Sequence, residues 1–365
     1  MACPYNITST NSEEVTYTSH LKLDTLLSLN QPLSDAHDEY CFVTTHQVYE
    51  LWFRQIIREL DSIREILPVL HVEKEKQLLA ISRLERIKKI WKLLVEQFDI
   101  METITPMDFA SFRGHLKSSS GFQSYQFRII ENKFGVRGEN RIRHNQASYS
   151  SVFKDDQLQL VKQSEQDLSC FDLIETWLEN LCSLISNAFN FWQMFTENCR
   201  KWLSEERKSA EKVQNPNGKD ALLDQCCQNE THFEGILEES KYEILRSKGN
   251  RYLSWKALQG ALMIYYYRDE IILHEAYQLI SLLMDIDDLM IKWRCSHILL
   301  VHRQLGSKTG TYGTSGYQYL RATFSDRYKV FLDFFNLSSY LIPSEYIPKI
   351  DKETRRSTLE AYMSN

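Results

Sequence analysis

Residues 276–305, AYQLISLLMDIDDLMIKWRCSHILLVHRQL, decide the fold. Their apolar side chains recur at alternating steps of three and four, which is the spacing of one face of an α-helix. The members of this stripe are Leu283, Ile286, Met290, Trp293, His297 and Leu300. Comparable spacing predicts further helices over 45–67, 76–101 and 255–268, and the stretch 171–202 is apolar and aromatic at helical spacing.

The composition favours the same fold class for the whole chain. Only 12 Gly and 7 Pro interrupt 365 residues, of which 43% are hydrophobic and 25% charged. Such a chain can bury a substantial core and has few helix breakers. No segment alternates convincingly as a strand. We therefore predict an all-α helical bundle.

Several stretches differ from the helical pattern, and they suggest a domain organisation. Residues 1–35 are polar, apart from a short apolar patch, and predict a loosely ordered N-terminal arm. The helical domain is expected over 36–345, with a C-terminal tail over 346–365. Within the domain, 135–165 is polar and poorly periodic, and 205–235 is rich in Glu, Lys and Asn and predicts an exposed insertion.

Charge and hydropathy exclude several classes of protein. The net charge of -6 argues against a nucleic-acid partner. No run of eighteen apolar residues exists, so a membrane span is not expected. The first twenty residues have neither a basic start nor an apolar stretch, and the eight cysteines show no CxxC pair. We expect a cytoplasmic protein with reduced thiols and neither a zinc site nor a disulfide framework.

His297 is the first candidate for chemistry. It continues the apolar stripe about 40° around the helix from Trp293, whereas His302 lies about 180° from Trp293. A histidine on an apolar face needs partners for its ring nitrogens, which iron and a hydrogen-bond acceptor would provide. Spacing alone leaves two roles open for His297, a metal ligand or the commoner satisfied core histidine.

Two further side chains face inward on predicted helices. His46 shares its helix side with Tyr49 and Phe53, where it could flank a cofactor or bond a nearby backbone group. Arg113 lies in an aromatic face with Phe109, and its guanidinium requires an anion. That anion is either a protein carboxylate or a ligand, and a structural salt bridge is the commoner case.

Two other kinds of motif give weaker indications of a functional site. The loop 306–316 contains four glycines but lacks the Gly-Lys-Ser/Thr of a phosphate loop, so it predicts either a mobile loop over a small ligand or a plain connection. The acidic residues of 238–239 and 285–288 are expected on solvated faces rather than in metal clusters.

The sequence resembles the tryptophan 2,3-dioxygenase family. The similar segments include HDEYCFVTTHQVYELWFRQIIRELDSIREIL (37–67), MDFASFRGHLKSSSGFQSYQFRIIENKFGV (107–136) and KWRCSHILLVHRQLGSKTGTYGTSGYQYLRATFSDRYKVFLDFFNLSSYLIP (292–343). Together with GALMIYYYRDE (260–270) they cover much of the chain outside the arm, the 205–235 stretch and the tail. The resemblance implies an all-α catalytic domain that encloses one haem b per subunit. It also implies a homotetramer, a dimer of dimers in which the arm reaches a neighbour's active site.

The family's motifs place roles on residues of this chain. The proximal iron ligand, in Trp-Arg-x-x-His, falls on His297, and the distal histidine, in Thr-His-Gln, falls on His46. The carboxylate-binding arginine falls on Arg113, and the threonine that meets the substrate's ammonium and carboxylate falls on Thr311. The remaining positions implied for the substrate pocket or the haem are Phe42, Tyr49, Phe109, Trp293, Ser120 and Gly121.

The implied activity is insertion of O2 across the indole C2–C3 bond of L-tryptophan. The product is N-formyl-L-kynurenine, and the reaction is the first step of tryptophan catabolism by the kynurenine pathway. The alternative is a haem-containing indole-binding or sensor protein of the same fold with altered or lost turnover.

The chain departs from the family pattern near the substrate. Tyr312 stands where the glycine-rich loop usually has Gly, and Ser119 replaces the usual Ala beside the indole pocket. Gly114-His115 replaces Glu-Tyr after the arginine. In the arm, Tyr17 matches the family but His20 replaces a second tyrosine. The departures near the substrate could change substrate affinity and selectivity. The departure at His20 could change the tetramer.

Overall fold

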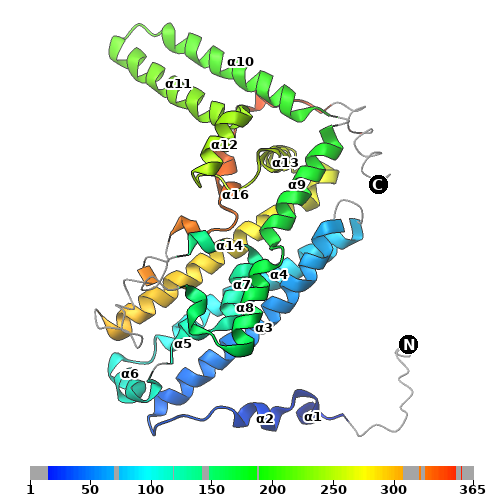
Figure 1. The fold of residues 1–365 in the computed structure, drawn as a ribbon. Helices are drawn as coiled ribbons and strands as arrows, with labels where there is room; N and C mark the ends of the chain where they lie inside the picture. Colours follow the sequence, from blue (N-terminus) through cyan, green and yellow to red (C-terminus); the bar gives the residue numbers. More distant parts are fainter. Residues whose placement is uncertain are drawn as a thin grey trace, which may run out of the picture.

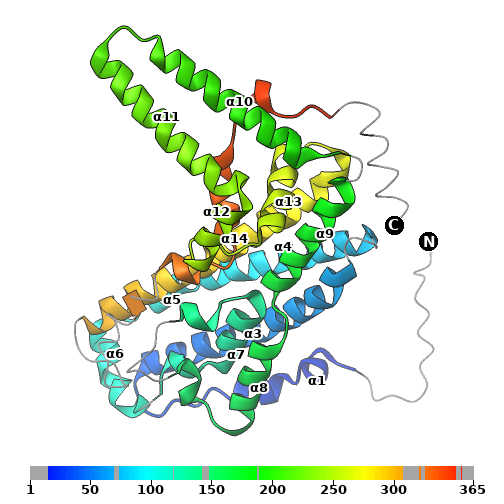
Figure 2. The same ribbon diagram turned by 45° about the horizontal axis from the view of Figure 1, so that its top comes forward.

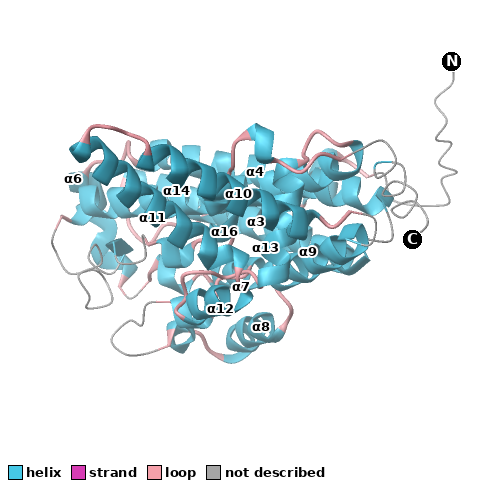
Figure 3. Cartoon of the chain, turned by 90° about the horizontal axis from the view of Figure 1, so that it is seen from above, coloured by secondary structure: helices cyan, strands magenta, loops and turns pink. Residues whose placement is uncertain are grey.

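The computed structural model describes residues 15–69, 74–117, 119–141, 148–186, 189–306, 320–321, 325–350 and 355. Regular structure in these ranges is entirely helical, and none of their residues lies in a strand (Figure 3). The prediction of an all-α fold is confirmed. No helix among the described residues is both long enough and apolar enough to cross a membrane.

The α-helices are α1 (Tyr17–Leu21), α2 (Leu23–Ser28), α3 (His37–Ile66), α4 (Lys74–Glu96), α5 (Phe98–Met101), α6 (Pro106–Arg113), α7 (Tyr125–Phe134), α8 (Asp155–Gln166), α9 (Cys170–Ser186), α10 (Phe191–Glu211), α11 (Pro216–Leu237), α12 (Glu239–Ser247), α13 (Trp255–Tyr266), α14 (Ile271–Leu305) and α16 (Leu332–Asn336). Short 3-10 turns lie at Leu67–Val69, Gly114–Leu116, Gly121–Gln123, Gly138–Asn140, Tyr149–Val152, Asp326–Tyr328, Leu337–Tyr340 and Ser344–Tyr346.

The long helices α3, α4 and α14 form the body of the molecule, and they lie side by side in Figures 1 and 2. α14 packs against α4 along much of its length, and α3 packs against both α4 and α7. The predicted stripe of α14 is buried in the core, since Leu283, Ile286 and Met290 are each 1% exposed. An aromatic cluster continues the core toward the other end of α14, where Trp293 lies 4.8 Å from Phe127 between ring centroids.

The α10–α11 pair projects from this body as an antiparallel hairpin (Figure 1). α9 and α13 pack closely beneath it, because Gly260 of α13 lets the two backbones approach. A Cβ at Gly260 would lie 2.6 Å from the carbonyl oxygen of Leu178.

One expectation about secondary structure needs correction, and two further stretches are largely helical. The apolar stretch 171–202 is divided between α9 and α10, because the chain leaves the helix after Ser186 and re-enters it at Phe191. The polar stretch 135–165 contains most of α8. The stretch 205–235 consists of the end of α10 and most of α11, so it is helical. Much of α8 and α11 faces solvent, and few of their residues are buried.

The expectation that the acidic residues of 285–288 all lie on solvated faces is wrong for one of them. Asp287 is fully buried, and its carboxylate accepts the backbone N–H of Phe331 at 2.8 Å. It therefore satisfies a donor of the chain that returns across α14. No group of three or more His, Cys, Asp or Glu in the described ranges could hold a metal ion.

Candidate active site

A large cavity lies between the ends of α3 and α14 and is closed on one side by α6 and residues 119–124. Its empty volume is about 1740 Å³, counting the part open to solvent. The lining combines side chains of α3, α5, α6, α7 and α14, so the cavity lies where these helices meet.

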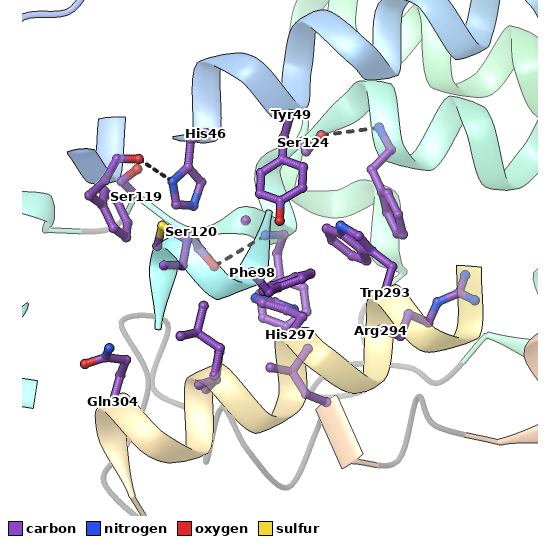
Figure 4. A pocket seen from close by; sticks show the side chains of 18 of the residues that line it. His46, Tyr49, Phe98, Ser119, Ser120, Ser124, Trp293, Arg294, His297 and Gln304 are labelled. Atoms are coloured by element: carbon purple, nitrogen blue, oxygen red, sulfur yellow. Dashed lines mark hydrogen bonds between the residues drawn. The ribbon is translucent and has the colours of Figure 1, made fainter. Parts of the chain in front are cut away.

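Two histidines face this cavity from opposite sides. His46 extends from α3 and His297 from α14, and the rings point toward one another across the space between the helices (Figure 4). The side chain of His302, by contrast, is exposed and does not line the cavity. The helical phase of α14 thus separates the two histidines as the sequence predicted.

The His297 ring is neutral at physiological pH. Burial lowers its pKa to about 4, and the positive potential of His46 and Arg128 acts in the same direction. The ring stacks near Trp293, with 5.6 Å between centroids, and lies 6.4 Å from Phe98. A neutral imidazole held against aromatic rings has a nitrogen lone pair available for a metal.

The orientation of His46 is fixed by its own helix. Nδ1 lies 2.7 Å from the carbonyl oxygen of Phe42, and because a carbonyl can only accept, Nδ1 is the protonated nitrogen. Burial lowers the pKa of His46, although the Phe42 carbonyl and Glu50 oppose the shift. Nε2 is then an unprotonated acceptor. A ligand N–H in the cavity is the complementary donor.

Aromatic side chains join α3 to α6 beside His46. Phe42 lies 4.2 Å from the His46 ring and 5.9 Å from Phe109, between centroids. Phe109 and Arg113 both line the cavity from α6, one turn apart. Two flat apolar rings and a guanidinium on the same wall suit a ligand with an aromatic end and an anionic end.

Tyr49 and the 120–121 turn complete the walls. The Tyr49 hydroxyl donates to the carbonyl oxygen of Leu94 at 3.0 Å, which holds the ring between α3 and α4. Ser120 caps the turn that follows, and its hydroxyl accepts the backbone N–H of Phe122 at 3.4 Å. Gly121 faces open space, since an added Cβ would meet no protein atom within 4 Å.

A buried charge cluster borders the cavity beside Trp293. The Glu131 carboxylate accepts hydrogen bonds from Arg294 at 2.5 Å, Arg141 at 2.6 Å and Arg128 at 2.9 Å. Burial alone would raise the pKa of Glu131, but the three guanidinium groups outweigh it and hold the pKa well below its usual range. Since Arg294 is three residues before His297, this cluster anchors the same segment of α14.

The donor set fits a metal that is held mainly by its own cofactor. A bare transition-metal ion needs three or four protein donors, and the described residues offer no such group. A haem would need as little as one donor side chain from the protein, and a neutral histidine in an apolar wall could be that donor. His297 meets that requirement, and the cavity in front of it is wide and largely apolar.

Comparisons with known proteins agree with this geometry. The family model for tryptophan 2,3-dioxygenase matches residues 5–341. The chain is 46% identical to the tryptophan 2,3-dioxygenases of Xenopus tropicalis and Rattus norvegicus, over 92% of this chain and 84% of each relative. It is 45% identical to that of Anopheles gambiae, over 93% of this chain and 89% of the relative. This chain belongs to the tryptophan 2,3-dioxygenase family. The resemblance inferred from the motifs is thereby confirmed.

The structure brings most of the residues expected from the family to one cavity. Those that line it are Phe42, His46, Tyr49, Phe109, Arg113, Ser120, Gly121, Trp293 and His297, and Ser119 lines it as well. Thr311 and Tyr312 lie outside the described residues. The roles assigned to these side chains in a tryptophan 2,3-dioxygenase remain predictions.

The cavity also contains residues that sequence reasoning missed. Glu50 and Gln304 are polar, and Phe98 and Phe127 are aromatic. Helical phase could have found the polar pair, because Glu50 follows His46 by four residues and Gln304 follows His297 by seven. Phe98 and Phe127 reach the cavity through packing between helices, which leaves no mark in the sequence.

Proposed function

We propose that the cavity is the active site of a haem-dependent tryptophan 2,3-dioxygenase. The reaction is insertion of both atoms of O2 across the indole C2–C3 bond of L-tryptophan, which gives N-formyl-L-kynurenine. The observation that carries the proposal is the pair of histidines that face one cavity from opposite helices, in a chain that belongs to this family.

His297 would hold the iron of haem b, because its ring is neutral and faces the cavity. Trp293 would pack beside the ligand, and the Ser120-Gly121 turn would lie against the cofactor. When bound, the haem supplies the activation of O2, which no side chain of the cavity can perform.

The substrate would lie on the His46 side of the cavity. His46 would accept the indole N–H at Nε2, since Nδ1 is engaged with Phe42, and this contact orients the ring without removing a proton. Phe42, Tyr49 and Phe109 would contact the indole. Arg113 would bind the carboxylate through two parallel hydrogen bonds.

Thr311 would contact the amino-acid end as well. The protein then contributes orientation and the exclusion of water, and holding two reactants in one geometry lowers a barrier without any proton transfer.

Two further predictions belong to the same proposal. We propose a homotetramer in which residues of the N-terminal arm contact a neighbouring subunit. Exposed apolar side chains of that arm support it, since Val15 is 70% and Tyr17 75% exposed. A cytoplasmic location stays a prediction.

An assay on purified, haem-loaded protein tests the function. We expect tryptophan and O2 to be consumed under reducing conditions and the absorbance of N-formylkynurenine to grow. Arg113→Met should raise the KM for tryptophan by about tenfold or more, because the variant loses the charged pair with the substrate carboxylate. Arg303→Met, which removes an exposed arginine of α14, is the matched control. Haem binding without turnover of tryptophan or other indoles would refute the enzyme and favour an indole-binding or sensor protein.

A further inference from the structure

The C-terminal end of α14 meets the chain that leads into α6. Gln304 follows His297 by seven residues, so it lies two turns further along nearly the same face of the helix. Its side chain lines the cavity (Figure 4). This places one polar side chain where the helix that carries His297 approaches the helix that carries Arg113.

Gln304 forms a specific hydrogen bond across this junction. Its Nε2 donates to the carbonyl oxygen of Ile104 at 2.6 Å. Ile104 immediately precedes Thr105, the N-cap of α6, and the first carbonyl used inside the helix is that of Thr105, which accepts from Phe109 at 2.9 Å. The Ile104 carbonyl therefore lies just outside the helix's own hydrogen-bond pattern, where a side chain from α14 can bind it.

The bond also fixes how the amide is turned. A carbonyl can only accept, so the nitrogen of Gln304 must face Ile104 and Oε1 must face away. Oε1 is buried and has no hydrogen-bond partner among the described residues. Reversing the amide would place two acceptors against each other, so the side chain has one favourable orientation.

α6 is a short helix with a small buried face. It is eight residues long, and Phe112 is its one fully buried residue. Phe109 and Arg113 face the cavity instead. A helix this short is not stable by its own hydrogen bonds, so its position depends on contacts with its neighbours.

We propose that Gln304 is a positioning residue for the reaction: its amide holds the start of α6 against α14 and so fixes Phe109 and Arg113 opposite His297. The inference rests on the proposed function, because it takes α6 to be a helix that binds tryptophan. Without the bond, α6 would spend part of its time in positions where Arg113 cannot reach the carboxylate. The apparent affinity for tryptophan is then reduced in proportion to the fraction of molecules in which α6 is correctly placed.

Gln304→Met tests the proposal, because methionine has nearly the same length and fills the same space but cannot donate. We expect the KM for tryptophan to rise about three- to ten-fold, the effect of one hydrogen bond. The kcat and the haem absorption spectrum should stay close to those of the wild type. Hydrogen–deuterium exchange should accelerate across 105–113.

Arg303→Met is the control, since Arg303 also joins α14 to this segment, through Glu102 at 3.0 Å, but with both side chains well exposed. It should change neither KM nor exchange appreciably. Wild-type KM and exchange in Gln304→Met, or equal effects in both variants, would overturn the inference. If the wild-type protein does not turn over tryptophan, the proposed function fails, and exchange across 105–113 still decides whether Gln304 holds α6.

Discussion

Replacing Glu131 with Gln should destabilise the protein by about 3–5 kcal/mol, far more than any exposed carboxylate would. The Glu131 carboxylate pairs with all three arginines of the cluster, and its side chain is 1% exposed. The variant keeps the shape of the side chain. It removes the negative charge, and it turns an NH2 group toward guanidinium groups that can only donate.

The magnitude follows from the burial of the partners. The side chains of Arg141 and Arg294 are 4% and 5% exposed, so the charges left behind cannot be solvated. Removing one partner of a buried ion pair costs about 3–5 kcal/mol, because an uncompensated charge remains. That is a large part of a typical total of about 5–15 kcal/mol.

Urea unfolding followed by circular dichroism measures the effect. With a denaturant slope near 3 kcal/mol per molar, the midpoint should fall by about 1 M or more. Glu102→Gln is the matched control, because its pair with Arg303 is exposed and contributes about 0–1 kcal/mol. Equal midpoint shifts in the two variants would refute the reasoning that buried and exposed pairs differ here.

Three further outcomes are expected. His297→Ala should abolish haem retention and the absorption of a histidine-ligated haem, whereas His302→Ala should retain both; the reverse result would contradict the ligand assignment. As pH falls, His297 of the haem-free protein takes up its proton at a higher pH in the unfolded chain than in the folded chain. The reason is that its pKa is about 4 when folded and 6.5 ordinarily. Stability measured by urea titration should therefore decline as pH falls from about 6.5 to 4, by about 3 kcal/mol at most, and the decline should be absent in His297→Ala. Gly260→Ala should lower the thermal midpoint, because its Cβ would lie 2.6 Å from the Leu178 carbonyl. Overpacking costs about 1–3 kcal/mol against a helix-propensity gain of about 1 kcal/mol, so an unchanged or raised midpoint would show that α9 and α13 can move apart.

Helical phase predicted more of the site than any motif taken alone. It separated His297 from His302 correctly, because a side chain's direction on a straight helix depends only on its position in the sequence. The same reasoning placed His46, Tyr49 and Phe53 on one side of α3, and the structure has Tyr49 and Phe53 buried and His46 in the cavity. Phase could not say which helices face one another, and the family resemblance provided that pairing.

Where the predictions failed, the deciding partner lies far along the chain. Asp287 was expected on a solvated face, but it binds the backbone of Phe331, forty-four residues away. The three arginines around Glu131 come from α7, α14 and the segment after α7, and nothing in their local sequence marks them as one cluster.

Gln304 belongs to the same class of residue, since its partner Ile104 is two hundred residues away. Helical phase places Gln304 on the same face as His297, but it does not reveal which group the amide binds. The structure instead gives it a carbonyl to bind and a wall of the cavity to form. The residues that face the cavity could therefore be predicted from one helix at a time, whereas the hydrogen-bond partners that hold those helices together could not. Gln304 would thus govern substrate affinity, and Glu131 the stability of the fold, through the helices that each of them holds in place.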